Sequence, residues 1–255
     1  MKHEKVTYQI EGQSYSGYWV FPTGEDPNLQ QRPAIIVAHA WMGQDQFARQ
    51  KAEALAELGY IAFAADLYGE GKATSKPEEA QHFMLPLFQD RALLQKRIRA
   101  VFDVVRQHPG VDPSNIGAIG FCFGGLTVIE LLRSGADVKG VVSFHGVLGN
   151  KMGSVQAKTV PIAPSVKGSL LILHGYEDPL VSLEDIIHMQ KELSEAKVDW
   201  QMNTYSNTSH AFTNPEAHDQ EHGLIFQPLS SERAWWAMIH FFSERFGLEK
   251  KLRAY

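Results

Sequence analysis

The sequence predicts an α/β fold in which helices cover both faces of a mostly parallel central sheet. Short apolar runs alternate with longer segments whose apolar residues recur at helical spacing, a pattern typical of strands joined by crossover helices. No repeat, low-complexity tract or Pro/Gly/Ser-rich linker divides the chain, so we expect one domain over residues 1–255. In such a fold, reactive loops lie at the carboxyl ends of the strands.

The first quarter of the chain contributes a hairpin and the first strand–helix–strand unit. Residues 5–10 and 15–21 are expected to pair as an opening β-hairpin. Residues 34–40, "AIIVAHA", form a continuous apolar run, which is typical of a strand covered on both faces. Residues 47–59 have helical spacing and end at a glycine, and residues 60–67 are the next strand candidate.

The middle of the chain repeats this alternation. Residues 90–108 place their apolar side chains on one helical face, and "IGAIGF" at 116–121 is a strand candidate. A helix is expected over residues 124–135, followed by a strand over 138–146. Residues 72–89 are interpreted as an insertion between core elements.

The last part of the chain supplies two further strands and two helices. The strands are expected at 169–175 and 199–206, with a helix over 183–197 between them. Residues 231–246, rich in aromatic side chains at helical spacing, are expected to form the closing helix and to pack in the core. Residues 147–168 are interpreted as a second insertion.

Composition narrows the classes of function. The formal net charge is −5, with both signs scattered along the chain, which argues against a nucleic-acid or anionic-membrane partner. No apolar run approaches the roughly 20 residues that span a bilayer, and the charged first residues lack the apolar region of a secretory signal. A lone cysteine suits a reducing compartment, so we expect a cytoplasmic protein. The sequence does not define an oligomeric state.

That cysteine, Cys122, lies in "GAIGFCFGG", between a predicted strand and a predicted helix. The arrangement Gly120-Phe121-Cys122-Phe123-Gly124 matches the G-x-S-x-G turn of α/β hydrolases, with cysteine in the serine position. The apex residue of such a turn is strained, and glycines beside it avoid collisions between strand and helix. A helix N-terminus favours the thiolate form of a thiol. The alternative is that Cys122 is a small core residue.

An acid and a histidine follow in the order that this turn requires. Asp178 lies just after the strand "LLILHG", and His210 lies after the last predicted strand. His210 would accept the thiol proton or stabilise the thiolate, and Asp178 would orient the imidazole. Alternatives remain for both residues. Asp178 could cap the following helix, with Glu177 as a competing acid, and His210 is one of eleven histidines, most of which are expected to be surface or core residues.

Acyl transfer also needs hydrogen-bond donors for the developing oxyanion. One donor is expected to be the backbone N–H of Phe123, and the other the backbone N–H of Trp41, with Ala40 as the alternative. We expect an apolar, aromatic pocket around the catalytic residues, to which we assign Phe121, Tyr68 and Phe212.

These stretches resemble the dienelactone hydrolase family. The resemblance is carried by "GFCFGG", "HGYEDPLV", "SHAFTNP" and "ADLYGEG", and it runs over nearly the whole chain. It implies a single α/β-hydrolase domain and hydrolysis of an ester or lactone through a Cys-acyl intermediate, with no metal or organic cofactor. A small-molecule ester or lactone is therefore the expected partner.

Two positions depart from the family pattern. Well-known members have a glutamate that pairs with the resting thiol, and the matching position here is Ala40. They also have an arginine after the "DLY" stretch that binds a substrate carboxylate, whereas "DLYGEG" offers Glu70. An acidic residue would repel an anionic dienelactone, so an uncharged ester is favoured. Lys72 close by is interpreted as a surface residue.

Other functions were weighed against this one. The stretch His218 to His222, "HDQEH", fits the zinc motif H-x-x-E-H, but it lies in a polar segment between Pro215 and Gly223, which favours a mobile loop near His210. A thioesterase or acyltransferase would use the same triad, and a non-catalytic binding module would keep the same fold. Redox sensing by Cys122 would lack a second, resolving cysteine.

Overall fold

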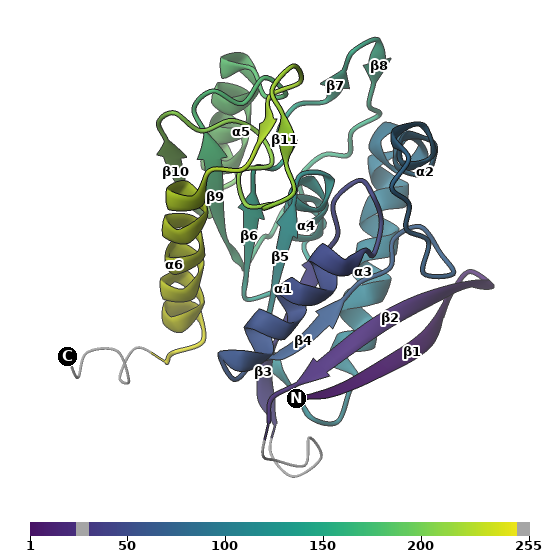
Figure 1. The fold of residues 1–255 in the computed structure, drawn as a ribbon. Helices are drawn as coiled ribbons and strands as arrows, with labels where there is room; N and C mark the ends of the chain where they lie inside the picture. The colour runs from purple at the N-terminus through teal and green to yellow at the C-terminus, as the bar shows by residue number, and fades with distance from the viewer. Residues whose placement is uncertain (24–30, 249–255) are drawn as a thin grey trace.

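The computed structural model describes residues 1–23 and 31–248, and the remainder of the domain expected over residues 1–255 lies outside the described residues. Its centre is an eight-stranded sheet in the order β1-β2-β4-β3-β5-β6-β9-β10 (Figure 1). β1 and β2 pair antiparallel, β2 pairs antiparallel with β4, and all later neighbours pair parallel. The predicted opening hairpin and the mostly parallel sheet are therefore confirmed.

The strands of the sheet and of two small hairpins have the following bounds. They are β1 Lys2–Ile10, β2 Gln13–Phe21, β3 Arg32–Ala38, β4 Ile61–Ala64, β5 Val111–Phe121, β6 Gly140–Phe144, β7 Lys151–Met152, β8 Val155–Gln156, β9 Ser169–Gly175, β10 Asp199–Tyr205, β11 His218–Asp219 and β12 Leu224–Ile225. β3, β4, β6 and β9 are buried along almost their whole length, because helices cover both of their faces.

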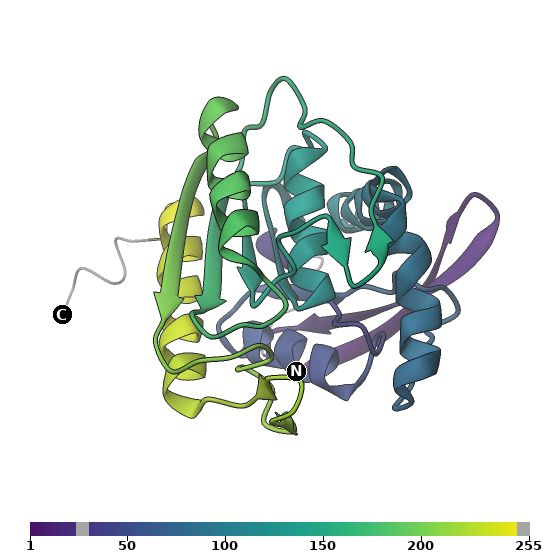
Figure 2. The ribbon, with the colours of Figure 1, turned by 90° about the horizontal axis from the view of Figure 1, so that it is seen from above.

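Helices lie on both faces of the sheet, as predicted. Their bounds are α1 Gln46–Glu57, α2 Pro77–Gln89, α3 Arg91–Arg106, α4 Phe123–Arg133, α5 Leu183–Glu195 and α6 Pro228–Arg245. α1 and α6 bury their apolar side chains in one core cluster, whereas α2, α3, α4 and α5 bury theirs in the cluster on the opposite face (Figures 1 and 2). None of the described helices is long and apolar enough to cross a membrane.

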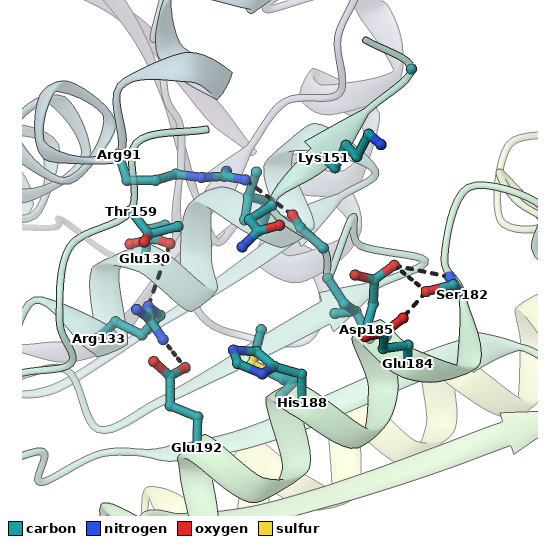
Figure 3. Close-up of a pocket in the computed structure, with 16 residues that line it drawn as sticks. Arg91, Glu130, Arg133, Lys151, Thr159, Ser182, Glu184, Asp185, His188 and Glu192 are labelled. Atoms are coloured by element: carbon teal, nitrogen blue, oxygen red, sulfur yellow. Dashed lines mark hydrogen bonds and ion pairs between the residues drawn. The ribbon is translucent and has the colours of Figure 1, made fainter. Parts of the chain in front are cut away.

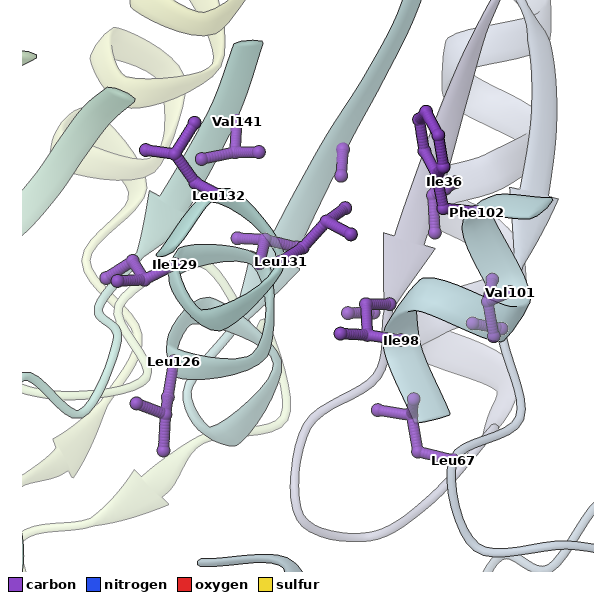
Figure 4. Close-up of a cluster of buried hydrophobic side chains, with 14 of the residues drawn as sticks. Ile36, Leu67, Ile98, Val101, Phe102, Leu126, Ile129, Leu131, Leu132 and Val141 are labelled. Carbon is purple, nitrogen blue, oxygen red and sulfur yellow. The ribbon is translucent and has the colours of Figure 1, made fainter. Parts of the chain in front are cut away.

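The larger cluster holds α3 and α4 against the middle of the sheet. Ile98 and Val101 of α3 and Leu131 of α4 are fully buried, and Figure 4 shows them pointing into the same apolar layer. α4 is buried along its entire length, so the residue at its first turn has a fixed position relative to β5. That rigidity matters because Cys122 is the N-cap of this helix.

The two predicted insertions contain regular structure that the sequence analysis did not assign. Residues 77–89 form α2, which begins at Pro77 and carries Glu78 and Glu79 in its first turn. Pro at the first helical position and acidic residues in the first turn are helix-start signals, so the beginning of this helix, though not its extent, left a signal in the sequence. Residues 151–156 form the short β7–β8 hairpin.

Parallel strands bring the predicted site residues to one edge. Cys122 follows β5, Asp178 follows β9 and His210 follows β10, all at carboxyl ends of parallel neighbours in the sheet. Trp41 follows β3 and Tyr68 follows β4 on the same edge. The sheet therefore gathers residues that are far apart in the sequence.

Candidate active site

Cys122 lies at the apex of a sharp turn from β5 into α4, with φ 55° and ψ −116°. A Cβ at Gly120 would lie 1.9 Å from the Gly124 carbonyl oxygen, and a Cβ at Gly124 would lie 2.1 Å from the Ala38 carbonyl oxygen. Neither contact is possible for a side-chain carbon, so the turn can close only with glycine at both positions. Cys122 is a free, half-buried cysteine, which fits an apex thiol better than a fully enclosed core residue.

Asp178 and His210 form a buried pair. The His210 Nδ1 atom lies 2.7 Å from Asp178 Oδ2, and the two residues are 1% and 5% exposed. The other Asp178 oxygen accepts a hydrogen bond from the Leu180 N–H at 2.9 Å, which fixes the carboxylate within its own turn. The competing acid Glu177 is exposed. The structure therefore brings Asp178, and not Glu177, to the histidine.

Backbone contacts hold the turn of the acid against the loop of the histidine. The Glu177 N–H donates to the Thr208 carbonyl at 2.9 Å, and the Ser209 hydroxyl donates to the Glu177 carbonyl at 3.1 Å. These bonds continue the parallel pairing of β9 with β10 beyond the ends of the strands. The separation of Asp178 from His210 is thus set by the backbone as well as by the side chains.

The electrostatic surroundings of His210 favour its charged form. Burial by itself lowers the pKa of His210, but the charge of Cys122 and the hydrogen bond to Asp178 raise it to about 10. The Nε2 atom of His210 is buried and has no hydrogen-bond partner among the described residues. An imidazole whose Nδ1 is held by a carboxylate and whose Nε2 is free can exchange a proton with a neighbouring thiol.

The two expected oxyanion donors come from different segments at the carboxyl edge of the sheet. Phe123 is the first residue of α4, so its N–H has no acceptor within the helix. Trp41 lies in the loop after β3, and its carbonyl accepts a hydrogen bond from the Tyr68 hydroxyl at 2.9 Å. This bond fixes the peptide that Trp41 shares with the next residue and ties the β3 loop to the β4 loop.

The three aromatic residues assigned to the pocket have different surroundings. The pKa of the Tyr68 hydroxyl is raised mainly by burial and to a smaller extent by the charge of Cys122. The second cause indicates that this hydroxyl lies on the side of the thiol. Phe121 and Phe212 are 1% and 0% exposed and belong to the core cluster beneath α1 and α6. Their burial supports a packing role under the site. Tyr68 is also buried, at 5% exposed, and belongs to the opposite core cluster, but its hydroxyl reaches the loop after β3, so it is the candidate for contact with substrate.

The departures from the family pattern are visible at two positions. Ala40 offers only its carbonyl, which accepts from the Gly43 N–H at 3.2 Å, so it supplies no acid to the thiol. Glu70 is exposed and forms a surface ion pair with Lys72 at 3.3 Å. Lys72 is thus a surface residue, as predicted, and it is paired with Glu70, the acid that follows the "DLY" stretch.

His145 is a site residue that the sequence analysis missed. It follows β6 on the same edge of the sheet, is 2% exposed and has φ 38°. Its ring lies 5.1 Å from that of His210, in an edge-on arrangement. The only signal in the sequence was a histidine at the carboxyl end of a predicted strand, which does not reveal the direction of its side chain.

The "HDQEH" stretch does not form a helix. His218 begins the two-residue strand β11, His222 lies in the following turn, and both are exposed. His222 pairs with Asp219 at 2.8 Å. Among the described residues, no group of three or more His, Cys, Asp or Glu side chains could hold a metal ion. The segment is tied to the site by its backbone, since the Ile225 N–H donates to the His210 carbonyl at 3.0 Å.

A cavity of about 530 Å³ lies between α4, α5 and the 147–168 segment (Figure 3). Its lining does not include Cys122, Asp178 or His210. Within the lining, Arg133 bridges Glu130 and Glu192, and Asp185 accepts from the Ser182 hydroxyl at 2.6 Å. The cavity is therefore separate from the candidate active site.

Known proteins share both the sequence pattern and this architecture. A family model described as the dienelactone hydrolase family matches residues 17–246. A putative carboxymethylenebutenolidase of Aquifex aeolicus is 24% identical over 244 residues, covering 94% of this chain and 97% of the relative.

Two solved structures match at higher identity. One is named m3DLH; it is 36% identical with a TM-score of 0.86, covering 95% of this chain and 98% of that chain. The other is a dienelactone hydrolase-like promiscuous phosphotriesterase from metagenomic libraries, 33% identical with a TM-score of 0.85 and the same coverage.

A mostly parallel sheet with helices on both faces, combined with a glycine-lined turn at its carboxyl edge, defines the α/β-hydrolase class. Within that class the match over residues 17–246 is decisive. The chain belongs to the dienelactone hydrolase family, and it is a hydrolase.

Proposed function

We propose that this protein hydrolyses an ester or lactone through a covalent thioester on Cys122. The observation that carries the proposal is the state of His210: Nδ1 is held by Asp178, Nε2 is buried without a partner, and the charge of Cys122 raises its pKa. The match to the dienelactone hydrolase family and the relative named as a putative carboxymethylenebutenolidase support lactones and esters as the substrate class.

In the first half of the reaction, the Cys122 sulfur attacks the carbonyl carbon of the substrate. The carbonyl π electrons move to oxygen, and the N–H groups of Phe123 and Trp41 would stabilise the oxyanion. When the tetrahedral intermediate collapses, the C–O bond breaks and the leaving alkoxide takes the proton from His210 Nε2. An alcohol is released from an ester, whereas a lactone ring opens and its hydroxyl stays on the acyl chain.

In the second half, neutral His210 accepts a proton from water as the water oxygen attacks the thioester. The carbon–sulfur bond then breaks, the acid is released, and the Cys122 thiolate is again paired with the His210 imidazolium. Asp178 keeps Nδ1 protonated throughout, so that Nε2 is the atom that exchanges the proton.

The site favours an uncharged acyl group. Glu70 replaces the arginine that binds a carboxylate in well-known family members, and its surface ion pair with Lys72 leaves no excess positive charge at that position. Tyr68 adds aromatic surface on the side of the thiol. We therefore propose a neutral or aromatic ester or lactone rather than a dianionic dienelactone. A cytoplasmic location and the absence of a nucleic-acid partner stay predictions.

The test uses a chromogenic short-chain ester with wild type, Cys122→Ala and His210→Ala. Intact mass is recorded during turnover. We expect both variants to lose activity and only the wild type to gain the mass of one acyl group. Full activity in Cys122→Ala would contradict the covalent mechanism. Added alcohols and thiols as competing acceptors then separate hydrolysis from acyl transfer, since a transferase yields new esters or thioesters.

Phosphotriester hydrolysis is a second candidate activity. It is favoured by the solved relative of 33% identity that is named as a promiscuous phosphotriesterase. The same thiol would attack phosphorus, and the aryloxide would leave. An aryl phosphotriester should either turn over or leave a phosphorylated Cys122, which intact mass distinguishes. A wild type that is neither turned over nor phosphorylated excludes this activity.

A further inference from the structure

His145 connects the turn that carries the thiol to the loop that carries the histidine. Its Nδ1 atom accepts a hydrogen bond from the Cys122 N–H at 3.2 Å, a group that also donates to the Phe144 carbonyl at 3.1 Å. Its Nε2 atom lies 2.8 Å from the hydroxyl oxygen of Thr213, three residues after His210. The His145 imidazole thus links the Cys122 turn to the loop that contains His210 and Thr213, two segments whose relative position the reaction depends on.

These contacts fix the tautomer of the ring. Since Nδ1 accepts from a backbone N–H, the ring proton lies on Nε2 and is donated to Thr213. Burial, followed by the charge of His210, lowers the pKa of His145 well below its usual value. Protonation would place a hydrogen on Nδ1, so that two donors, Nδ1–H and the Cys122 N–H, would face each other and the hydrogen bond would be lost. His145 is therefore a neutral bridge beside a charged histidine.

The ring also supports His210 directly. The ring centroids of His145 and His210 lie 5.1 Å apart in an edge-on arrangement. The ring of Phe212 is also edge-on to that of His145, with centroids 5.2 Å apart. Thr213 is 2% exposed, so solvent does not compete for its hydroxyl. His145 fills the space behind His210 and limits the directions in which that imidazole can turn.

The backbone at His145 is held in an unusual conformation for this purpose. Its φ of 38° lies in the left-handed region, which is unfavourable for a residue with a side chain. The next residue is Gly146, and a Cβ there would lie 2.2 Å from Ser143 Oγ, so the turn after His145 passes too close to β6 for a side chain. Strain of this kind persists only where surrounding contacts determine it, and it concentrates at functional sites.

We propose that His145 is a positioning residue, which holds the Cys122 turn and the His210 loop in register through both halves of the reaction. The proposal rests on the proposed function, since His145 acts only through Cys122 and His210. Nδ1 of His145 holds the backbone N–H of Cys122, and Nε2 holds Thr213 in the loop that carries His210.

Three variants separate the parts of this role. His145→Phe keeps a ring of similar volume and removes both hydrogen bonds. His145→Asn keeps an acceptor close to the position of Nδ1 and tolerates positive φ, but it does not reach Thr213. Thr213→Val keeps the shape of the acceptor residue and removes its hydroxyl, so it tests the bridge without altering the strained backbone.

The matched control is His108→Phe. His108 Nδ1 also accepts a backbone hydrogen bond, from Gly110 at 3.2 Å, but it lies before β5 at the opposite end of that strand from Cys122. Rates are normalised to folded enzyme by titrating Cys122, the only thiol in the chain, with an alkylating reagent.

We expect His145→Phe to lower kcat by about 100-fold and Thr213→Val by about 10-fold, with KM within twofold of wild type. His145→Asn should recover part of the loss, and His108→Phe should leave kcat unchanged. If His145→Phe and Thr213→Val both retain kcat per titrated site, the positioning role is wrong, even when Cys122→Ala is inactive. If Cys122→Ala is itself active, the proposed function fails first.

Discussion

At the scale of single residues, the site depends on which of two adjacent acids faces the histidine. Asp178 is buried against His210 at 2.7 Å, whereas Glu177 contributes backbone contacts and an exposed side chain. Two adjacent acids therefore differ in position: the Asp178 carboxylate contacts the imidazole, whereas the Glu177 carboxylate points to solvent.

Asp178→Asn should lower kcat by roughly 100- to 10,000-fold, because the amide no longer selects the Nδ1-protonated tautomer or stabilises the imidazolium. Glu177→Gln is the matched control and should keep kcat within twofold. Steady-state hydrolysis of a chromogenic ester measures both. Equal losses in the two variants would show that the turn matters only as a whole.

The charge of His210 gives a second prediction. Burial lowers its pKa, while Cys122 and Asp178 raise it to about 10, so the imidazole keeps its proton as pH rises from neutrality towards that value. In Cys122→Ala all of the raising contribution of Cys122 is lost while burial remains, so the pKa of His210 should fall. Imidazole NMR titration of the ¹⁵N-labelled protein measures this shift.

His222 provides the internal control for that titration. Its pKa is raised by the exposed Asp219 with which it pairs, and no contact links this pair to Cys122. The His222 resonance should titrate identically in wild type and variant. An unchanged pKa of His210 in Cys122→Ala would show that the thiol and the imidazole are not coupled.

The residues of the proposed triad were predictable from the sequence, whereas His145 was not. Cys122, Asp178 and His210 each follow a recognisable apolar strand in the order typical of the class. His145 depends on a positive φ and on a hydrogen bond to a backbone N–H, and neither leaves a trace in residue pattern. Likewise, the flanking aromatics Phe121 and Phe212 are adjacent to the site in sequence but point into the core.

At the scale of elements, the glycines of the β5–α4 turn determine whether the thiol can be presented. Gly120→Ala should lower the free energy of unfolding by about 3 kcal/mol and abolish hydrolysis, because the new Cβ would meet the Gly124 carbonyl oxygen at 1.9 Å. Urea unfolding and ester hydrolysis measure the two effects.

The control for this substitution is Gly153→Ala in the β7–β8 hairpin. Gly153 has φ 57°, and a Cβ there would meet nothing within 4 Å. The free energy of unfolding of this variant should fall by only about 1–2 kcal/mol, the cost of an alanine in the left-handed region, and its activity should be unchanged. If Gly120→Ala behaved like Gly153→Ala, steric closure of the turn would not explain its glycines.

Most elements were predictable because buried parallel strands produce continuous apolar runs. The exception is α2, whose segment was interpreted as an insertion. Its interior contains Pro86, which interrupts the helical pattern, and its burial is confined to Ala80, Met84, Leu87 and Phe88. The short hairpins β7–β8 and β11–β12 have strands of two residues each, too short for any periodicity.

At the scale of the whole molecule, the sheet separates two apolar cores that must unfold together. Phe242 of α6 belongs to one core and Leu131 of α4 to the other, and both are fully buried. Since both cores pack on the same strands, losing either one exposes a face of the whole sheet.

Phe242→Ala should therefore cost about 3–5 kcal/mol and Leu131→Ala about 2–5 kcal/mol, in a single unfolding transition. Far-ultraviolet circular dichroism and tryptophan fluorescence should give the same midpoint in each variant. Trp19 and Trp235 report on opposite faces, because they pack against different clusters. Separate midpoints for the two probes would mean that the faces unfold independently.

The close approach of Gly120 and Gly124 to backbone oxygens also bears on how such an enzyme can evolve. A single nucleotide change converts a cysteine codon into a serine codon, and the close backbone contacts of the turn lie at Gly120 and Gly124 rather than at the apex side chain. Moving the nucleophile by one position would instead require new glycines at several sites at once. On this scaffold the proposed nucleophile can therefore change from cysteine to serine by one mutation, while its position at the apex of the turn stays fixed.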